Sequence, residues 1–170
     1  HAPRSVRLYV ADGASATVVE TFSGNAAAHV ANHATFAQLG TGAKLTHVTV
    51  DLSDRAATHF STVEYEIGAD AQLRTLTVHA GAALERTQIF ARFGGEGAHA
   101  DFTGLNLVGD GQHADITLEA RHAVGHCTCK PLFKQIARGR SKAVFQGKIV
   151  VERDAQKTDA KLMMQGLMLS

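Results

Sequence analysis

The sequence has only two cysteines, two prolines and no tryptophan among its 170 residues. Two cysteines cannot provide the disulfide framework of a small secreted domain, and such usage is typical of a reducing cytoplasm. No apolar stretch approaches the roughly 20 residues that a transmembrane helix needs. We therefore expect a cytoplasmic protein that is not embedded in a membrane.

An excess of charge of either sign is also missing. Lysine and arginine number 17 and aspartate and glutamate 16, which gives a formal net charge of +1. A nucleic-acid-binding domain normally shows a basic stripe with aromatic residues along it. The one basic run, from Lys134 to Lys142, is short and is typical of a solvated loop. Neither nucleic acid nor a membrane is therefore expected as a partner.

Glycine, by contrast, is abundant, with 16 residues, and it recurs in similar turn-like strings. Five such strings, LGTGAKL, IGADAQL, AGAALER, GGEGAHA and VGDGQHA, begin at residues 39, 67, 80, 94 and 108. Their spacing is close to 14 residues or, once, to twice that value, with LSDRAATHF as the intervening turn. A unit of about 14 residues therefore recurs from about residue 40 to about residue 122.

Between these turns, apolar and polar residues alternate, which is the pattern of half-buried strands. In THVTVDL (46–52), Val48, Val50 and Leu52 share one face, and His47, Thr49 and Asp51 share the other. We expect the apolar face to be buried and the polar face to be exposed. Similar strands are expected at 61–67, 73–79, 86–93, 101–108 and 114–121.

Equal strands joined by equal turns suit two all-β architectures, an antiparallel meander or sandwich and a β-solenoid. Hairpins usually show Asn-Gly or Asp-Gly turns between strands of variable length. A nearly constant period is what the stacking of similar coils requires, because each coil must align with its neighbour. The pattern favours a solenoid, with two units in each flattened coil of about 28 residues.

Ten histidines invite a metal interpretation. His47, His79, His99 and His113 fall near matching places in their units. A metal site needs three or four converging ligands, and no His-x-His followed by Glu, as expected of a cupin-type enzyme, is found. We expect instead a stacked, exposed face of His, Thr and Glu side chains.

The 14-residue repeat is no longer visible after residue 122. PLFKQIARG (131–139) predicts a short helix, because proline suits the first helical position and glycine the C-terminal cap. Two strand pieces are expected in 141–154, a polar turn in 155–162 and a last apolar strand in 165–170. Since solenoid ends need covering, we expect residues 1–170 to be one β-helix core domain of a longer protein, or to be covered by a partner.

This segment carries a resemblance to a known family. The strings FQGKI (145–149) and AQKTDA (155–160), within the run from Leu132 to Ser170, together with VETFSG (19–24), resemble the SufD branch of the SufB/SufD family. The family belongs to the SUF iron–sulfur cluster assembly machinery. The resemblance implies a right-handed parallel β-helix and a non-catalytic scaffold that pairs with SufB and works with the ATPase SufC. The cluster would then be the product of the complex, with no cofactor bound by this chain alone.

Two departures from the family pattern bear on these implications. Aligned with SufB, the chain has Met164 where SufB has a cysteine linked to cluster assembly, which favours SufD because a thioether poorly replaces a thiolate on iron. The family's later Cys-x-His-Gly motif and helical region, which docks SufC, have no counterpart before Ser170. A homodimer is a further possibility, because open solenoid edges carry unpaired backbone groups.

The string GHCTCK (125–130) holds the candidate metal ligands His126, Cys127 and Cys129. Thiolates suit zinc and iron–sulfur clusters, and the two cysteines point the same way along an extended chain. Two thiols and one imidazole make at most part of a site. We therefore expect two buried or idle thiols and no metal site.

No catalytic motif competes with this interpretation. Neither Gly-x-Ser-x-Gly nor the phosphate-binding Gly-x-x-x-x-Gly-Lys-Ser/Thr is present, and Glu64 and Glu66 are more typical of a solvated edge than of an acid–base pair. Two alternatives stay open. One is a β-helix enzyme acting on polysaccharide, which the aromatic content of 6% argues against. The other is a small metal-binding β-sandwich, which the ten histidines suggest.

Overall fold

In the computed structural model, which describes residues 3–24, 28–153 and 155–169, every regular element is a β-strand. No helix long and apolar enough to cross a bilayer occurs in these ranges. The strands are β1 Arg4–Val10, β2 Ser15–Ser23, β3 His29–Leu39, β4 Lys44–Leu52, β5 Ala57–Ile67, β6 Gln72–His79, β7 Leu84–Phe93, β8 His99–Val108, β9 His113–His122, β10 Thr128–Arg138, β11 Lys142–Val151, β12 Asp159–Ala160 and β13 Met163–Leu169.

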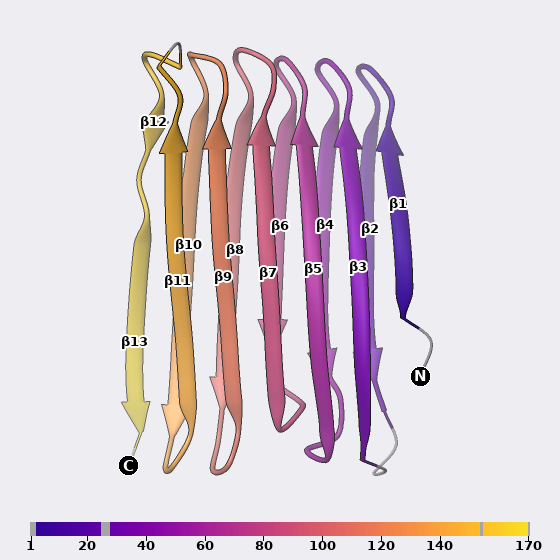
Figure 1. Cartoon of the computed structure of the whole chain (residues 1–170), viewed down its shortest axis with the longest axis vertical. Helices are drawn as coiled ribbons and strands as arrows, with labels where there is room; N and C mark the ends of the chain where they lie inside the picture. The colour runs from indigo at the N-terminus through magenta and orange to yellow at the C-terminus, as the bar shows by residue number, and fades with distance from the viewer. Residues whose placement is uncertain (1–2, 25–27, 154, 170) are drawn as a thin grey trace.

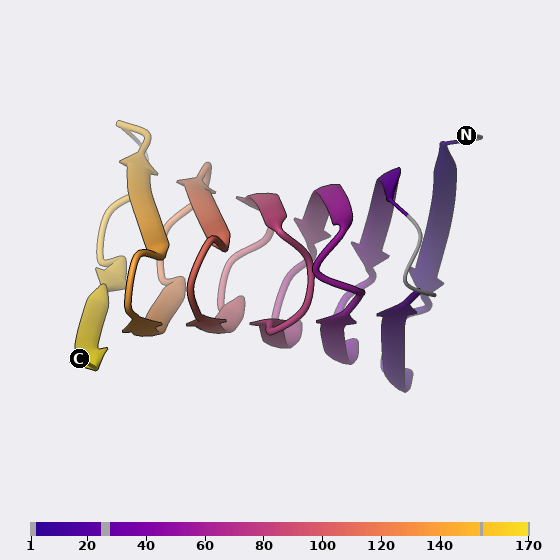
Figure 2. The same cartoon turned by 90° about the horizontal axis from the view of Figure 1, so that it is seen from below.

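The strands form two sheets that face each other across a narrow interior (Figures 1 and 2). The odd-numbered strands make one sheet in the order β1-β3-β5-β7-β9-β11. The even-numbered strands make the other, in the order β12-β10-β8-β6-β4-β2, with β13 also paired to β10. All these pairings are parallel, so the antiparallel sandwich alternative is wrong for the described residues.

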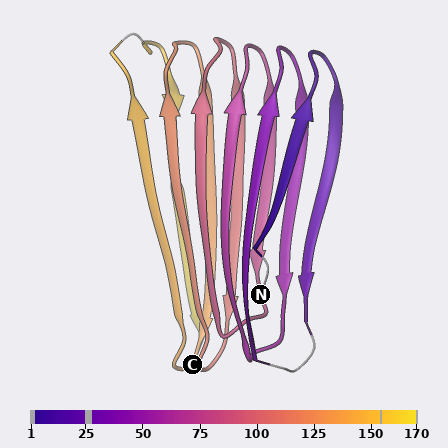
Figure 3. The ribbon, with the colours of Figure 1, turned by 45° about the vertical axis from the view of Figure 1, so that its right-hand side comes forward.

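Each coil combines one odd-numbered and one even-numbered strand, and successive coils stack in chain order (Figure 3). Thr49 lies beside Thr77 and Phe36 beside Glu64, so one coil takes 28 residues at these places. The front strands run upward in Figure 1, the back strands run downward, and each coil lies to the left of the previous one. This winding is right-handed, as parallel crossovers normally are, and it confirms the expected β-helix.

The helix expected at 131–139 is wrong, because these residues continue strand β10. Pro131 is tolerated in this strand because, among the described residues, it has no paired residue on one side. On that side of β10, the pairing with β12 ends at Cys129 and the pairing with β13 begins only at Leu132. A missing N–H at Pro131 therefore removes no ladder hydrogen bond on that side. The coils extend beyond the sequence repeat at 40–122, from β1 to β13.

The expected orientation of 46–52 is also wrong. His47 and Asp51 are each 1% exposed, whereas Leu52 is 56% exposed. Leu45, just after the turn, points into the core, and strand alternation then turns His47, Thr49 and Asp51 inward as well. His79 is likewise buried, so the expected exposed histidine face is wrong for His47 and His79.

The core is therefore divided along the strands. Apolar side chains fill the half near the turns that lead from odd- to even-numbered strands, which is the upper half in Figure 1. Polar side chains occupy much of the other half, where even-numbered strands end and odd-numbered strands begin. The largest buried apolar side chains include Phe93, Phe102, Phe133, Leu45, Ile67 and Leu73.

Candidate functional site

The structure does not bring the three candidate ligands of GHCTCK together. His126 is exposed and has a positive φ of 61°. It occupies the turn position that Gly42 and Gly97 hold in earlier coils, with φ of 65° and 71°. Cys127 and Cys129, by contrast, are buried at 1% and 0% exposure. The imidazole and the two thiols therefore lie on opposite sides of the coil wall.

The two thiols pack as small core residues. Cys129 lies beside the buried Ala100 of the preceding coil, and Cys127 Sγ contacts the carbonyl oxygens of Gly95 and Gly125 at 3.4 Å. Burial raises the pKa of the Cys127 thiol, and it raises that of Cys129 to about 12. Protonated, buried thiols are poor nucleophiles and poor ligands. Among the described residues, no group of three or more His, Cys, Asp or Glu stands ready to hold a metal ion.

The interior offers a more unusual arrangement, which we call the polar lumen. It consists of inward-facing polar side chains from β2 to β8, most of them toward the ends of even-numbered strands and the starts of odd-numbered strands. Water is largely excluded there, so each polar group needs a partner within the coil stack. The members are Glu20, His33, Thr35, His47, Thr49, Asp51, His59, Ser61, Thr75, Thr77, His79, Glu85, Thr87 and Asn106.

Glu20 is the centre of the first hydrogen-bond network. Its carboxylate lies 2.9 Å from His47 Nε2, 3.2 Å from His33 Nε2 and 3.1 Å from the Thr35 hydroxyl. His47 Nδ1 lies 2.6 Å from the Tyr65 hydroxyl, so the imidazole bridges Glu20 and Tyr65. Burial alone would raise the pKa of Glu20, but the hydrogen bond and charge of His47 outweigh it and lower the pKa. Glu20 is therefore ionised at neutral pH.

Asp51 and His59 form the second network across one coil. His59 Nδ1 hydrogen-bonds Asp51 Oδ2, and the backbone N–H of Ser53 donates to Asp51 Oδ1 at 2.7 Å. Burial raises the pKa of Asp51, but the bonds from His59 and Ser53 outweigh burial and lower it. In the next coil His79 Nε2 lies 2.8 Å from the Thr87 hydroxyl. Burial lowers the pKa of His79 to about 4, so this imidazole stays neutral.

Glu85 extends the second network by one strand. It is 1% exposed and lies beside His59 in the strand register. The backbone N–H of Gly81 donates to its Oε1 at 3.0 Å. Burial, with the nearby charge of Asp51, raises the pKa of Glu85 to about 8. This carboxyl group is therefore largely protonated at neutral pH, next to an ionised Asp51.

Within the part of the chain that the structure describes, some buried polar atoms of the polar lumen have no hydrogen-bond partner. His33 Nδ1, His59 Nε2 and Glu85 Oε2 are buried and have no hydrogen-bond partner among the described residues. A cavity of about 540 Å³ lies at this end of the coils and is lined by Arg4, Phe22, His33 and His59, among others. Phe22 packs its ring 5.0 Å from the ring of His33 and 4.3 Å from that of His59. The phenyl ring therefore packs against both imidazoles at the wall of this cavity.

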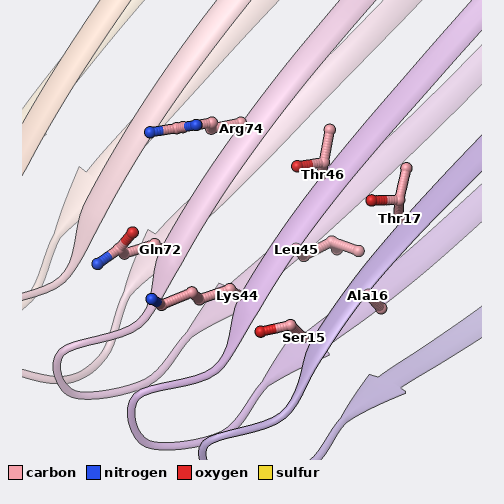
Figure 4. A pocket seen from close by; sticks show the side chains of 8 residues that line it. All are labelled: Ser15, Ala16, Thr17, Lys44, Leu45, Thr46, Gln72 and Arg74. Carbon is pink, nitrogen blue, oxygen red and sulfur yellow. The ribbon is translucent and has the colours of Figure 1, made fainter.

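A second hollow, of about 380 Å³, lies on the outer face of the even-numbered sheet (Figure 4). Two cationic side chains, Lys44 and Arg74, border it together with hydroxyl groups and the amide of Gln72. Arg74 is 72% exposed at its side chain, and its Nε lies 4.0 Å from Asp101. Exposed cations are screened by water and salt. This hollow is therefore a less specific candidate than the polar lumen.

The residues of the polar lumen were not identified as a group from the sequence. The alternation of polar and apolar residues was visible in these strands. Because Val48 and Val50 are apolar, however, the wrong face of 46–52 was predicted to be buried. The usable signal is the residue that follows each turn. Leu45 and Leu73 face inward, and every second residue after them shares that direction. Counting from these leucines would have placed His47, Asp51 and His79 in the interior.

Comparisons with known proteins agree with this architecture. The family described as "SUF system FeS cluster assembly, SufBD core domain" matches residues 2–170. The iron–sulfur cluster assembly protein SufD of Escherichia coli K12 is 27% identical over 163 residues, which cover 95% of this chain and 38% of that protein. A SufBD family protein of Mycobacterium tuberculosis is 32% identical over 136 residues, or 75% of this chain and 34% of that protein.

A SufBD family protein of Synechocystis is 28% identical over 134 residues, which cover 78% of this chain and 29% of that protein. No solved structure gave a significant match. The chain therefore spans less than two fifths of the length of these relatives. Because the family match extends over all the coils of the β-helix, the chain belongs to the SufBD core family of the SUF iron–sulfur cluster assembly system.

Proposed function

We propose that this chain is the core of a non-catalytic scaffold in SUF iron–sulfur cluster assembly, one that pairs with SufB and works with the ATPase SufC. The observation that carries the proposal is the family match over residues 2–170, which covers every coil of the described residues. Membership in this family supports participation in cluster assembly. The cluster is the cargo of the complex rather than a cofactor of this chain, and a cytoplasmic location follows from the same proposal.

Met164 supports a SufD-like rather than a SufB-like role. It lies in β13 beside Phe133 of β10, and 53% of its surface is exposed. A thioether at this place is a weak ligand for iron compared with a thiolate. A partner that supplies the thiolate is therefore part of the proposed assembly.

The last strand of the odd-numbered sheet offers a surface for this pairing. Among the described residues, β11 pairs only with β9, so its other edge can accept a strand. Backbone groups at such an edge are a template for another strand, whether from the continuing chain, from SufB or from a second copy. Val151, at the end of β11, is 49% exposed and could add apolar contact there.

Co-purification of the full-length protein with SufB and SufC tests the proposal. The expected result is a stable ternary complex in which omission of this protein abolishes or slows cluster formation. Size measurement of the protein alone separates the hetero-complex from a homodimer. If the full-length protein bound neither SufB nor SufC, the proposed role would be wrong.

A further inference from the structure

The outer face of the odd-numbered sheet carries a row of side chains that runs across its strands. Strand register places one residue of each strand next to one of the following strand. Neighbours in such a row lie about 4.8 Å apart. From β1 to β11 the row reads Arg7, Phe36, Glu64, Phe90, Glu119 and Lys148.

Glu64 differs from the other acidic residues on this face. Glu66 lies 3.3 Å from Arg92, Asp115 lies 3.8 Å from Arg86, and Glu119 lies 3.2 Å from Lys148. Glu64 is exposed and makes no side-chain hydrogen bond or ion pair within the described ranges. Its neighbours in the row are two phenyl rings instead of cationic side chains. The described part of the sheet therefore presents one carboxylate without an ion pair, flanked by aromatic residues.

The surroundings of Glu64 are hollowed and unusually apolar for an outer surface. Phe36 and Phe90 are each 37% exposed, and Tyr9 on the same face is 69% exposed. One hollow of about 390 Å³ includes Tyr9 and Phe36, and another of about 280 Å³ includes Phe90 and Arg121. Glu64 lines both hollows, as does the ion-paired Glu66. Exposed aromatic residues beside hollows are typical of protein interaction surfaces.

The spacing of this row suits a cation. Phe36 and Phe90 are two strands apart, or about 10 Å, so a cation above Glu64 lies about 5 Å from each ring. Attraction between a cation and an aromatic face operates within about 6 Å of the ring centre. A guanidinium group can stack on phenyl rings and bind a carboxylate through two N–H groups at once, which an ammonium group cannot do.

We propose that Phe36, Glu64 and Phe90 form a docking site for an arginine side chain on an extended segment of a partner protein. The two hollows receive the residues that flank this arginine. The hollow near Tyr9 suits an apolar residue, because Tyr9 and Phe36 line it. The hollow near Arg121 suits a small neutral residue, because three glutamates line it beside Arg92 and Arg121. The site lies away from the edge of β11, so it goes beyond the proposed assembly role and does not depend on it.

Ligand-observed saturation-transfer NMR on the full-length protein tests the site with two short peptides. The probe is acetyl-Leu-Arg-Ala-amide, and its control replaces arginine by citrulline, which has nearly the same shape but no charge. We expect saturation transfer to the arginine side-chain protons, and at least about threefold weaker binding of the citrulline peptide, as for the loss of one exposed ion pair. Equal binding of both peptides, or of neither, would overturn the proposal.

Three variants and a matched control locate the binding. Glu64→Gln, Phe36→Leu and Phe90→Leu are each expected to weaken binding of the arginine peptide at least about threefold. Asp115→Asn is the control, because Asp115 is an acidic residue of the same sheet that already pairs with Arg86 and lines neither hollow. It should leave the dissociation constant within about twofold. An equal loss with Asp115→Asn would show attraction to the general charge of the face and contradict the site. Circular dichroism of each variant verifies that its fold is unchanged.

Discussion

Asp51 on β4 and His59 on β5 hydrogen-bond each other across the interior of a single coil, where they are 1% and 5% exposed. The bond joins the two sheets at a place where an apolar contact would be usual. Asp51 also accepts a bond from the Ser53 backbone, which fixes the turn between the two strands. The pair therefore connects the two sheets and the turn. Its loss should lower the free energy of unfolding of the whole stack of coils.

We expect Asp51→Asn to lower the free energy of unfolding at neutral pH by about 2 kcal/mol, because a buried hydrogen bond to a charged group is lost. The lowered pKa of Asp51 means that its contribution is present at neutral pH and disappears as the pH falls through that pKa. Urea denaturation at several pH values measures both effects. Glu66→Gln, which breaks the exposed pair with Arg92, should cost at most about 1 kcal/mol. Equal costs for the two variants would contradict the prediction.

Glu85 should make the fold less stable as the solution becomes alkaline. Its pKa rises from 4.5 to about 8 on folding, so the folded state binds more protons than the unfolded state between these values. Stability therefore decreases with rising pH across this interval, by at most about 1.4 kcal/mol per pH unit. Glu85→Gln removes this dependence. We expect the variant to exceed the parent in unfolding free energy above pH 8 and to match it near pH 4.5, as measured by urea denaturation. Parallel pH profiles of the two proteins would show that Glu85 does not titrate in this range.

Gly104 provides a test of packing in the later coils. A methyl group added there would meet the ring of Phe133, which stacks on Phe145 with ring centres 4.0 Å apart. We expect Gly104→Ala to lower the melting temperature, at a cost of about 1–3 kcal/mol for overpacking. Gly166→Ala is the control, since an added methyl group there meets no atom within 4 Å. A neutral Gly104→Ala would show that the Phe133 ring moves aside freely.

His126 should be replaceable by glycine with a gain in stability. Its φ of 61° lies in the left-handed region, which disfavours residues with a Cβ atom and which Gly97 occupies in the preceding coil. We expect His126→Gly to raise the unfolding free energy by about 0.5–1 kcal/mol. The converse change, Gly42→Ala, should lower it by a similar amount, because an added Cβ atom there meets no atom within 4 Å. Metal analysis of the purified protein should give the same content for the parent and for His126→Gly. A loss of bound metal in the variant would restore the interpretation of GHCTCK as a metal site.

The sequence was informative where the signal was local and repeated. The turn glycines and the alternation between them predicted strands and a constant coil, because every coil must present the same turn to its neighbours. The helix prediction at 131–139 was wrong because proline and glycine occur at helix ends but also in strands and turns. Pro131 fills a gap in strand pairing, and Gly139 has a positive φ of 61° in a turn.

The candidate site was harder to predict, because alternation shows that two faces differ without showing which one is inside. Val48 and His47 stand on opposite faces whichever way the strand is turned. Coil stacking and the inward direction of Leu45 decided that His47 is buried. The contacts of the polar lumen join residues that are far apart in the chain, such as Glu20 and His47, so no local spacing could reveal them.

By itself, then, the sequence determined the strand-and-turn unit, the period of the coil and the resemblance to the SufBD core family. The tertiary structure alone decided which face of each strand is buried, that His126 is a turn residue apart from the thiols of Cys127 and Cys129, and that Asp51, His59 and Glu85 meet. The reason is physical. Turn and strand preferences act between neighbours in the chain, whereas burial, hydrogen bonding and pKa depend on groups that only the stacking of coils brings together.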